Sequence, residues 1–198
     1  PGISSAASDV YKRQQLMINL FRKVKKNTFR PINIPKFDKS IDDRCKKNNW
    51  FKLKKKPDIL ILEGWCVGAK PENSKSLKRP INVLEKNADN KKIWRSYVNN
   101  QLKLKYSKLF DQLDSLLYLK AKNFKLLKRW RLKQEKKLKM KNGTKKNSKI
   151  MNEKEVETFM MTYQRITQNM FKHAPTYSSA IIDLNENHQI KKVRLKHA

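Results

Sequence analysis

The fold is decided by the stretch Asp58-Ile-Leu-Ile-Leu-Glu63-Gly64-Trp65-Cys66-Val67-Gly68. Its aliphatic run over 59–62 has no polar alternation, which is typical of a strand buried on both faces of a parallel sheet. Two similar runs follow at 116–119 and 180–184. Because an acidic residue at the carboxyl end of such a strand lies where α/β sheets bind their ligands, Glu63 is a candidate site residue. An ordinary turn after a strand is the alternative interpretation.

The segments between these runs have helical periodicity. Apolar residues recur at intervals of three and four over 98–113 and again over 156–170, so each set shares one face of a helix. Asn152 and Glu155 have the spacing of a capping box before the second helix. Strands that alternate with helices predict an α/β protein built from crossover units. The basic stretch 136–149 has little apolar surface to bury and is predicted to be a loop or lid.

The composition is that of a folded and strongly basic chain. In 198 residues, 48 Lys and Arg stand against 17 Asp and Glu, which gives a formal net charge of +31. The hydrophobic content of 38% is too high for an intrinsically disordered tail. The charge raises the hypothesis of a nucleic-acid-binding protein. Most of the excess is Lys, whereas Arg is favoured for phosphate and base contacts, so the composition disfavours a nucleic-acid partner, and a basic nucleic-acid-binding protein is kept as an alternative function.

Membrane and metal sites are not indicated. No apolar window reaches the ~18 to 20 residues that a membrane span needs, so we predict no membrane partner. Cys45 and Cys66 have neither the number nor the spacing of a disulfide framework or a zinc site. This use of cysteine favours a reducing, cytoplasmic location.

Several ordered motifs extend the pattern of the opening stretch towards both ends of the chain. They are Pro35 to Arg44, Asp58 to Gly68, Pro80-Ile-Asn82-x-Leu-Glu85, Trp94-Arg95-x-Tyr97-Val98-Asn99, Trp130-Arg131-x-x-Gln134-Glu135 and Tyr163-Gln164-Arg165-Ile-Thr167. Together they resemble the D-glycerate 3-kinase family, a branch of the P-loop kinases related to uridine and pantothenate kinases. The resemblance covers the chain from Pro31 to the C-terminus.

The resemblance implies an α/β fold, with a P-loop kinase-type parallel sheet flanked by helices. It also implies ATP-dependent phosphorylation of D-glycerate to 3-phosphoglycerate, with ATP and Mg²⁺ as cofactors and small molecules as the only partners. In related kinases a strand-end carboxylate organises hydrated Mg²⁺, a role that falls here to Glu63 as a catalytic and metal residue. Gly64 would let the backbone approach the nucleotide. A kinase of another small alcohol or of a nucleoside is the alternative.

The acceptor site implied by the resemblance lies in the segment that ends at Arg44. Glycerate is a small anion with two hydroxyls, so its site needs cationic donors and an acceptor near the attacking hydroxyl. The candidates are Lys39 and Arg44 for the carboxylate, and Asp38, Asp42 and Asp43 for a hydroxyl. A solvated turn with local ion pairs is the alternative interpretation of the same residues.

Two arginines are implied as catalytic anion contacts. Arg131 lies in a lid-like region over 122–150 and would stabilise the transferring phosphoryl group. Alternatively, Arg131 only pairs with Glu135 one helical turn later. Arg165 is the second candidate. Gln164 beside it stands where the family has Glu, which puts in doubt an ion pair between these two positions.

The chain departs from the family at its start. No G-x-x-x-x-G-K-[ST] motif occurs, so the phosphate-cradling loop and the strand before it are predicted to be missing. Residues 4–14 resemble the translation of a sequencing-library adaptor. We therefore expect 1–14 to be an artefact and 15–198 to be the C-terminal part of a single kinase domain. Such a fragment is predicted to expose strand edges and to be inactive.

Overall fold

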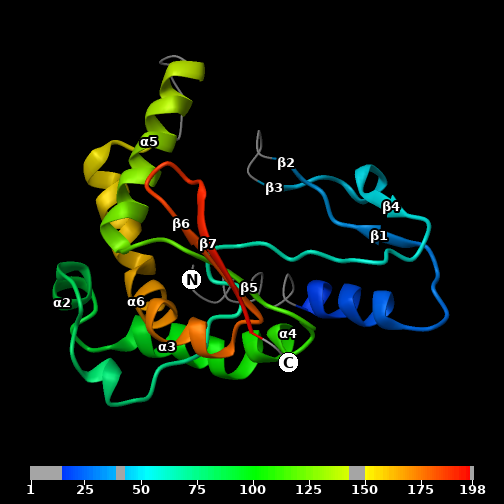
Figure 1. Cartoon of the computed structure of the whole chain (residues 1–198), viewed down its shortest axis with the longest axis horizontal. Helices are drawn as coiled ribbons and strands as arrows, with labels where there is room; N and C mark the ends of the chain where they lie inside the picture. The colour runs from blue at the N-terminus through cyan, green and yellow to red at the C-terminus, as the bar shows by residue number, and fades with distance from the viewer. Residues whose placement is uncertain (1–14, 39–42, 143–149, 197–198) are drawn as a thin grey trace. The chain divides into compact units, whose positions relative to one another are not determined.

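The computed structural model describes residues 15–38, 43–142 and 150–196. The chain divides into two compact units, which are considered separately (Figure 1). The first unit contains Pro1–Trp65 and Lys105–Leu113, and the second contains Cys66–Leu104 and Asp114–Ala198. The predicted artefact at 1–14 and the part of the predicted lid at 143–149 lie outside the described residues.

A helix and two short strand pairs make up most of the first unit. The helix spans 15–25. The strand pairs are both antiparallel: β1 (Ile32–Ile34) with β4 (Phe51–Leu53), and β2 (Phe37–Asp38) with β3 (Asp43–Arg44), with a 3-10 turn at Lys47–Asn49. Ile18 and Phe21 of the helix pack with Leu109 of α4 (Ser107–Phe110) and form a small core.

The aliphatic run over 59–62 is not a strand, so this element of the prediction is wrong. Leu60 and Leu62 pack against the core of the first unit, whereas Ile59 and Ile61 are 78% and 81% exposed. A strand needs a neighbour for its backbone hydrogen bonds, and none of the strands in the described ranges pairs with this run. The run therefore alternates between packed and exposed side chains instead of being buried on both faces.

The second unit contains a three-stranded sheet in the order β5-β6-β7. β5 (Leu117–Lys120) pairs in parallel with β6 (Ala180–Leu184), and β6 pairs antiparallel with β7 (Ile190–Leu195). The two parallel strands are connected by the long helices α5 (Phe124–Asn142) and α6 (Glu153–Tyr177), which pack on each other. This arrangement confirms the crossover unit predicted from the runs at 116–119 and 180–184.

Both long helices follow from local sequence. α6 begins at the predicted capping box, in which Asn152 Oδ1 accepts from the backbone N–H of Glu155, and a carboxylate oxygen of Glu155 accepts from that of Asn152. Its predicted apolar stripe is buried at Val156 and Met160. α5 continues to Asn142, because Lys, Leu and Met have high helix propensity. The prediction of a loop is therefore wrong for 136–142.

Five short helical elements lie between 76 and 110. They are the 3-10 turn η2 (Ser76–Lys78), α2 (Val83–Ala88), α3 (Ile93–Gln101), the π-helical turn η3 (Leu102–Tyr106) and α4, which follows η3 directly. The helix predicted over 98–113 is thus present but interrupted by a π turn. Because a π turn holds more residues than an α turn, it rotates the apolar stripe. Leu102 is buried in the second unit, whereas Leu109 is buried in the first.

One face of the sheet is apolar and exposed. Leu117 and Leu119 of β5 are 62% and 61% exposed, and Val193 and Leu195 of β7 are 51% and 69% exposed. The strand register places these four residues on one face, across β6. Ile181, which points to the opposite face, is buried. We call this surface the open sheet face.

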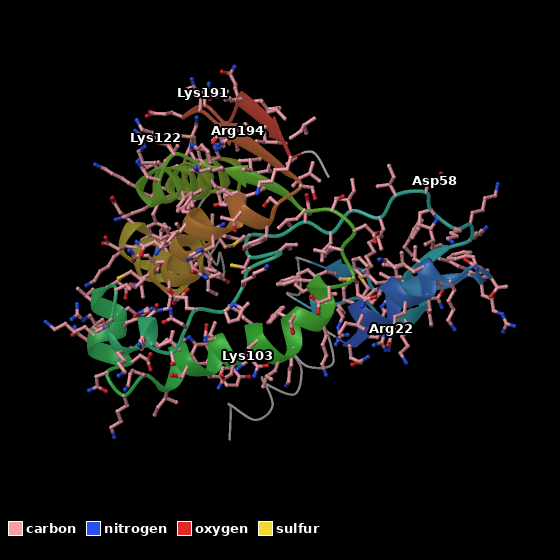
Figure 2. The ribbon with its side chains drawn as sticks, turned by 60° about the horizontal axis from the view of Figure 1, so that its bottom comes forward. Arg22, Asp58, Lys103, Lys122, Lys191 and Arg194 are labelled. Atoms are coloured by element: carbon pink, nitrogen blue, oxygen red, sulfur yellow. The ribbon has the colours of Figure 1, made fainter. Side chains whose placement is uncertain are left out.

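Basic side chains are spread over several elements. Arg22 lies on the helix over 15–25, Lys103 on η3 and Lys191 on β7 (Figure 2). None of the helices in the described residues is long and apolar enough to cross a membrane. Within the same residues there is no group of three or more His, Cys, Asp or Glu side chains that could hold a metal ion.

Candidate functional site

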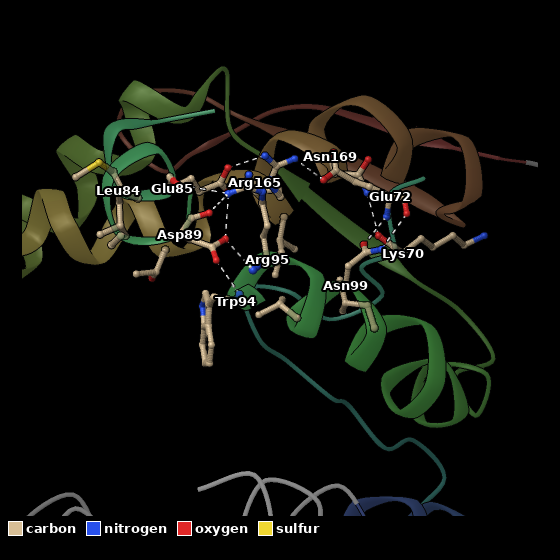
Figure 3. Close-up of a pocket in the computed structure, with 16 residues that line it drawn as sticks. Lys70, Glu72, Leu84, Glu85, Asp89, Trp94, Arg95, Asn99, Arg165 and Asn169 are labelled. Carbon is tan, nitrogen blue, oxygen red and sulfur yellow. Dashed lines mark hydrogen bonds and ion pairs between the residues drawn. The ribbon is translucent and has the colours of Figure 1, made fainter. Parts of the chain in front are cut away.

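A cavity of about 190 Å³ lies between α2, α3 and α6 of the second unit (Figure 3). Its apolar lining comes from these three helices and from the first residue of η3: Leu84, Ala88, Trp94, Val98, Leu102, Met161 and Ile166. Charged side chains, including Arg95 and Arg165, also line it. We call it the helix cavity.

Arg165 of α6 connects the walls of the helix cavity. Its Nε and one Nη donate to the two carboxylate oxygens of Glu85 on α2, at 2.7 and 2.6 Å, and its other Nη donates to Glu72 at 3.0 Å. The two remaining N–H groups donate to the backbone carbonyls of Ser76 and Arg79. A guanidinium has five N–H donors, so every donor of Arg165 is engaged.

The partners of Arg165 raise its pKa. The hydrogen bonds with Glu85 are the largest cause of this rise. Burial comes next and lowers the pKa, and the hydrogen bond with Glu72 raises it again. The side chains of Arg165, Glu85 and Glu72 are only 9%, 12% and 19% exposed. This ion-pair network therefore joins α6 to α2 and to the loop that contains Glu72.

Asp89 and Arg95 form a second buried ion pair beside the cavity. Arg95 Nη1 donates to Asp89 Oδ2 at 3.0 Å, and its Nε donates to the carbonyl of Leu77 at 2.8 Å. The Asp89 carboxylate also accepts from the backbone N–H groups of Trp94 and Arg95. Because these N–H groups lie in the first turn of α3, Asp89 also satisfies donors that a helix leaves without partners at its start.

Asn82 anchors α2 to α6. Its side-chain oxygen accepts from the backbone N–H of Glu85, which makes it the N-cap of α2. Its amide nitrogen donates to the carbonyl of Met161 at 3.0 Å and to the side-chain oxygen of Gln164 at 3.1 Å. Gln164 thus contacts Asn82. The sequence motif containing Asn82 and Glu85 therefore builds one wall of the helix cavity.

Glu63 and Gly64 are exposed and precede a turn over 65–68. They belong to the first unit, whereas the helix cavity belongs to the second. Gly68 has a φ of +78°, a backbone conformation that favours glycine, and a Cβ at this position would also lie 2.7 Å from a methyl carbon of Leu116, which would have to shift.

The predicted acceptor residues lie partly outside the described ranges. Asp38 and Asp43 are paired across β2 and β3, and Arg44 is paired with Phe37. Lys39 and Asp42 are not among the described residues. The backbone therefore brings the ends of the predicted acceptor segment together, and the roles of its side chains stay predictions.

Arg131 is held on α5 by its neighbours. One Nη lies 2.6 Å from Glu135 Oε1 and the other donates to Gln134 at 2.7 Å, which realises the helical pair considered as the alternative. The guanidinium also lies over the ring of Phe159, 5.2 Å from its centroid. Its Nε is buried and has no hydrogen-bond partner among the described residues. The lid role of Arg131 stays a prediction.

Burial shifts three other groups in the second unit. It raises the pKa of the Cys66 thiol to about 11 and, with the nearby Tyr177, the pKa of Tyr118 to about 12. Burial also raises the pKa of Tyr177, over whose ring the Lys70 ammonium lies 4.2 Å from the centroid. The thiol of Cys66 and the phenols of Tyr118 and Tyr177 are therefore neutral near pH 7.

Sequence reasoning misses the residues that pair with the two buried arginines. Glu72 and Asp89 stand alone in polar segments, and no spacing marks them as partners of Arg165 and Arg95. Asn82 and Glu85 carry a usable signal, because a three-residue separation before an apolar helix indicates an N-cap.

Several known proteins, including the following three, are similar to this chain. An uncharacterised kinase named mug58 from Schizosaccharomyces pombe is 32% identical over 151 residues, which are 73% of this chain and 51% of that protein. The structure matches D-glycerate 3-kinase from Cryptococcus neoformans var. grubii with a TM-score of 0.73 and 20% identity, over 92% of this chain and 66% of that one. The chain has the fold of D-glycerate 3-kinase.

A second solved structure supports the same fold. The YGR205w protein matches with a TM-score of 0.64 and 24% identity, over 93% of this chain and 65% of that one. No family model matches the chain. The α/β class, with a sheet that contains a parallel strand pair and is flanked by helices, is thereby confirmed, as is the resemblance seen in the motifs. The chain spans 51% of the curated relative and 65 to 66% of the two solved proteins.

The residues present do not by themselves form a site for ATP and Mg²⁺. The exposed Glu63 belongs to no cluster of metal-ligating side chains within the described ranges, and the sequence contains no phosphate-cradling loop. We therefore derive no reaction step through the nucleotide or the metal from this chain.

Proposed function

We propose that the protein to which this chain belongs is an ATP-dependent kinase that converts D-glycerate to 3-phosphoglycerate, with Mg²⁺ as its metal ion. The match to D-glycerate 3-kinase over 92% of the chain carries this proposal, and the order of the sequence motifs supports it. The curated relative, which is itself called a kinase, supports phosphoryl transfer without indicating an acceptor.

The proposal gives each predicted residue a distinct task. In a longer protein that supplies the phosphate-cradling loop, Glu63 would hold a water ligand of Mg²⁺ and Gly64 would allow close approach of the nucleotide. The hairpin that ends at Arg44 binds the acceptor. Arg131 approaches the phosphoryl group from α5, which requires it to exchange Gln134 or Glu135 for the anion.

Arg165 would need a larger rearrangement to serve as an anion contact. All five of its N–H donors are engaged by protein oxygens, so binding an anion requires loss of at least one of these bonds. A structural role of Arg165 would appear in the free energy of unfolding of its variants, whereas a catalytic role would appear in kcat.

The chain over 15–198 is proposed to be inactive alone, because it contains no phosphate-cradling loop. The test is a coupled assay of ATP-dependent 3-phosphoglycerate formation by this chain and by a longer version that includes its upstream coding sequence. We expect product only from the longer protein. Product formed by the short chain would contradict the truncation, and a longer protein inactive on D-glycerate but active on a nucleoside or another small alcohol would change the acceptor.

A matched pair of variants in the longer protein tests Glu63. Glu63→Gln removes the carboxylate charge and is expected to lower kcat by about 100-fold or more, because metal positioning supplies much of phosphoryl-transfer catalysis. Glu153→Gln changes an exposed carboxylate in the first turn of α6 and should leave kcat unchanged. Equal effects of the two substitutions would remove Glu63 from the mechanism.

A further inference from the structure

We propose that the helix cavity binds a small uncharged molecule that combines a flat apolar body with one hydrogen-bond donor, such as a hydroxyl or an N–H group. The cavity is formed within the second unit alone, so its description does not depend on the first. The proposal also does not depend on the kinase activity, because it concerns binding in the absence of ATP.

The size and lining of the cavity define the apolar body. Its volume is about 190 Å³, and aliphatic side chains, Met161 and Trp94 supply its apolar lining. An enclosed apolar cavity of roughly 150 Å³ is large enough to bind benzene, so the volume of the helix cavity is sufficient for one ring. A single aromatic ring with a few substituents therefore fits, and burying its apolar surface favours binding.

The charges around the cavity select against ions. Arg165 is paired with Glu85 and Glu72, and Arg95 is paired with Asp89. The third cation of the lining, Lys70, holds its ammonium over the ring of Tyr177, which is not part of the lining. An anion entering the cavity would either remain without a partner in an apolar site or have to displace a carboxylate from a buried arginine. This part of a strongly basic chain is therefore suited to neutral ligands and not to glycerate.

Hydrogen bonds fix the positions of the cavity walls relative to one another. The cavity is therefore formed before a ligand binds. Asn99 of α3 exchanges two hydrogen bonds with the backbone of Glu72, at 2.8 and 3.0 Å. Asn82 joins α2 to α6, and Arg165 joins both to the loop over 72–79. Because these polar contacts resist collapse, the space between the helices persists and a ligand gains contacts without reorganising them.

Two side-chain oxygens on α6 can accept the ligand's donor. Thr162 lines the cavity and donates its hydroxyl proton to the carbonyl of Phe159 at 2.7 Å, which leaves oxygen lone pairs as acceptors. Asn169, at another point of the lining, donates its amide to the carbonyl of Lys70 at 2.9 Å and presents its own carbonyl oxygen. A phenolic hydroxyl or an indole N–H supplies the matching donor.

The test measures methyl chemical shifts of the whole chain during titration with phenol and indole. We expect saturable shifts at the methyl groups that line the cavity: those of Leu84, Val98, Leu102, Met161 and Ile166. Ile18, in the core of the first unit, serves as the reference and should not shift. Benzoate and D-glycerate should bind at least about tenfold more weakly than phenol, because each carries a charge that the cavity cannot pair.

Matched variants link the binding to this cavity. Val98→Phe fills it and should weaken phenol binding by about tenfold or more, whereas Val83→Phe, at an exposed position of α2, should change binding less than about twofold. If circular dichroism shows that Val98→Phe has unfolded, Ala88→Leu is used with the same expectation. Absence of saturable shifts, equal binding of benzoate, or unchanged binding by the filled variant would each overturn the proposal.

Discussion

Arg165 has two possible roles, as an anion contact and as the centre of a structural ion-pair network. In the sequence it is a cation in a family motif, and so a candidate anion contact. In the structure it lies between two carboxylates and two backbone carbonyls, and it holds three segments together. A buried charge with full hydrogen bonding is costly to disturb, because its partners would be left without compensation.

Substitution of Arg165 should therefore destabilise the second unit. Arg165→Met leaves the carboxylates of Glu85 and Glu72 without their cation, and we expect the free energy of unfolding to fall by about 3 to 5 kcal/mol. Arg165→Lys keeps the charge but has fewer donors, so its loss should be smaller. Urea unfolding followed by circular dichroism measures both.

Arg129→Met is the matched control for this experiment. Arg129 pairs with Glu186 at 2.8 Å, but the two side chains are 56% and 60% exposed. Exposed ion pairs contribute little to stability, so the unfolding midpoint should not change measurably. A control as destabilised as Arg165→Met would show that burial is not the cause of the effect.

At the scale of elements, the N-caps of α2 and α6 have the same chemistry and different surroundings. Asn152 caps α6 through a local box only. Asn82 caps α2 and also donates to Met161 and Gln164 on another helix. A residue at the start of a six-residue helix therefore contributes to tertiary packing as well as to local structure.

Replacing the two capping residues should separate these contributions. Asn152→Ala is expected to cost about 1 kcal/mol, the usual value of a lost N-cap. Asn82→Ala should cost more, because it also leaves the Met161 carbonyl without its donor. Asn82→Ser keeps a capping oxygen and removes the amide donor, so thermal or urea unfolding should place it between Asn82→Ala and the unmodified chain. Equal losses for Asn82→Ala and Asn152→Ala would contradict the tertiary role.

At the scale of the molecule, the open sheet face leaves apolar side chains of the second unit exposed to solvent. β5 has a parallel neighbour on one side only, and no strand in the described ranges pairs with its other edge. Parallel strands are ordinarily covered on both faces. Exposed Leu117, Leu119, Val193 and Leu195 therefore form an apolar surface of the kind that marks an interface.

This surface predicts dye binding by the short chain. The chain over 15–198 should bind 8-anilinonaphthalene-1-sulfonate with increased fluorescence, because the open sheet face offers apolar area. Leu119→Lys with Val193→Lys should lower the signal, whereas Lys192→Gln, whose position points to the opposite face, should lower it little. In the longer protein, which we expect to cover this face, the signal should be weak. Strong dye binding by the longer protein would contradict the expectation that its additional residues cover the open sheet face.

Short-range sequence patterns correctly predicted the helices and strands that are specified by residues close together in the sequence. The capping box, the periodic stripe of α6 and the two runs that become β5 and β6 are each specified by neighbours within one or two turns. The run over 59–62 has an equally clear pattern but is not a strand, because a strand is completed by hydrogen bonds to a segment distant in the sequence. The break of the 98–113 helix at η3 likewise depends on packing in two separate units.

By itself, the sequence determined the α/β class, the capped helix α6, the crossover between β5 and β6 and the family resemblance, because these depend on residue order and short-range periodicity. Only the tertiary structure decided that Arg165 meets Glu72 and Glu85, that Asn82 reaches α6, and that a cavity open to solvent lies between three helices. The partners of Arg165 lie 80 and 93 residues away along the chain. A charge pattern cannot identify partners at such separations, because many Lys and Arg residues compete for few carboxylates until folding fixes their positions.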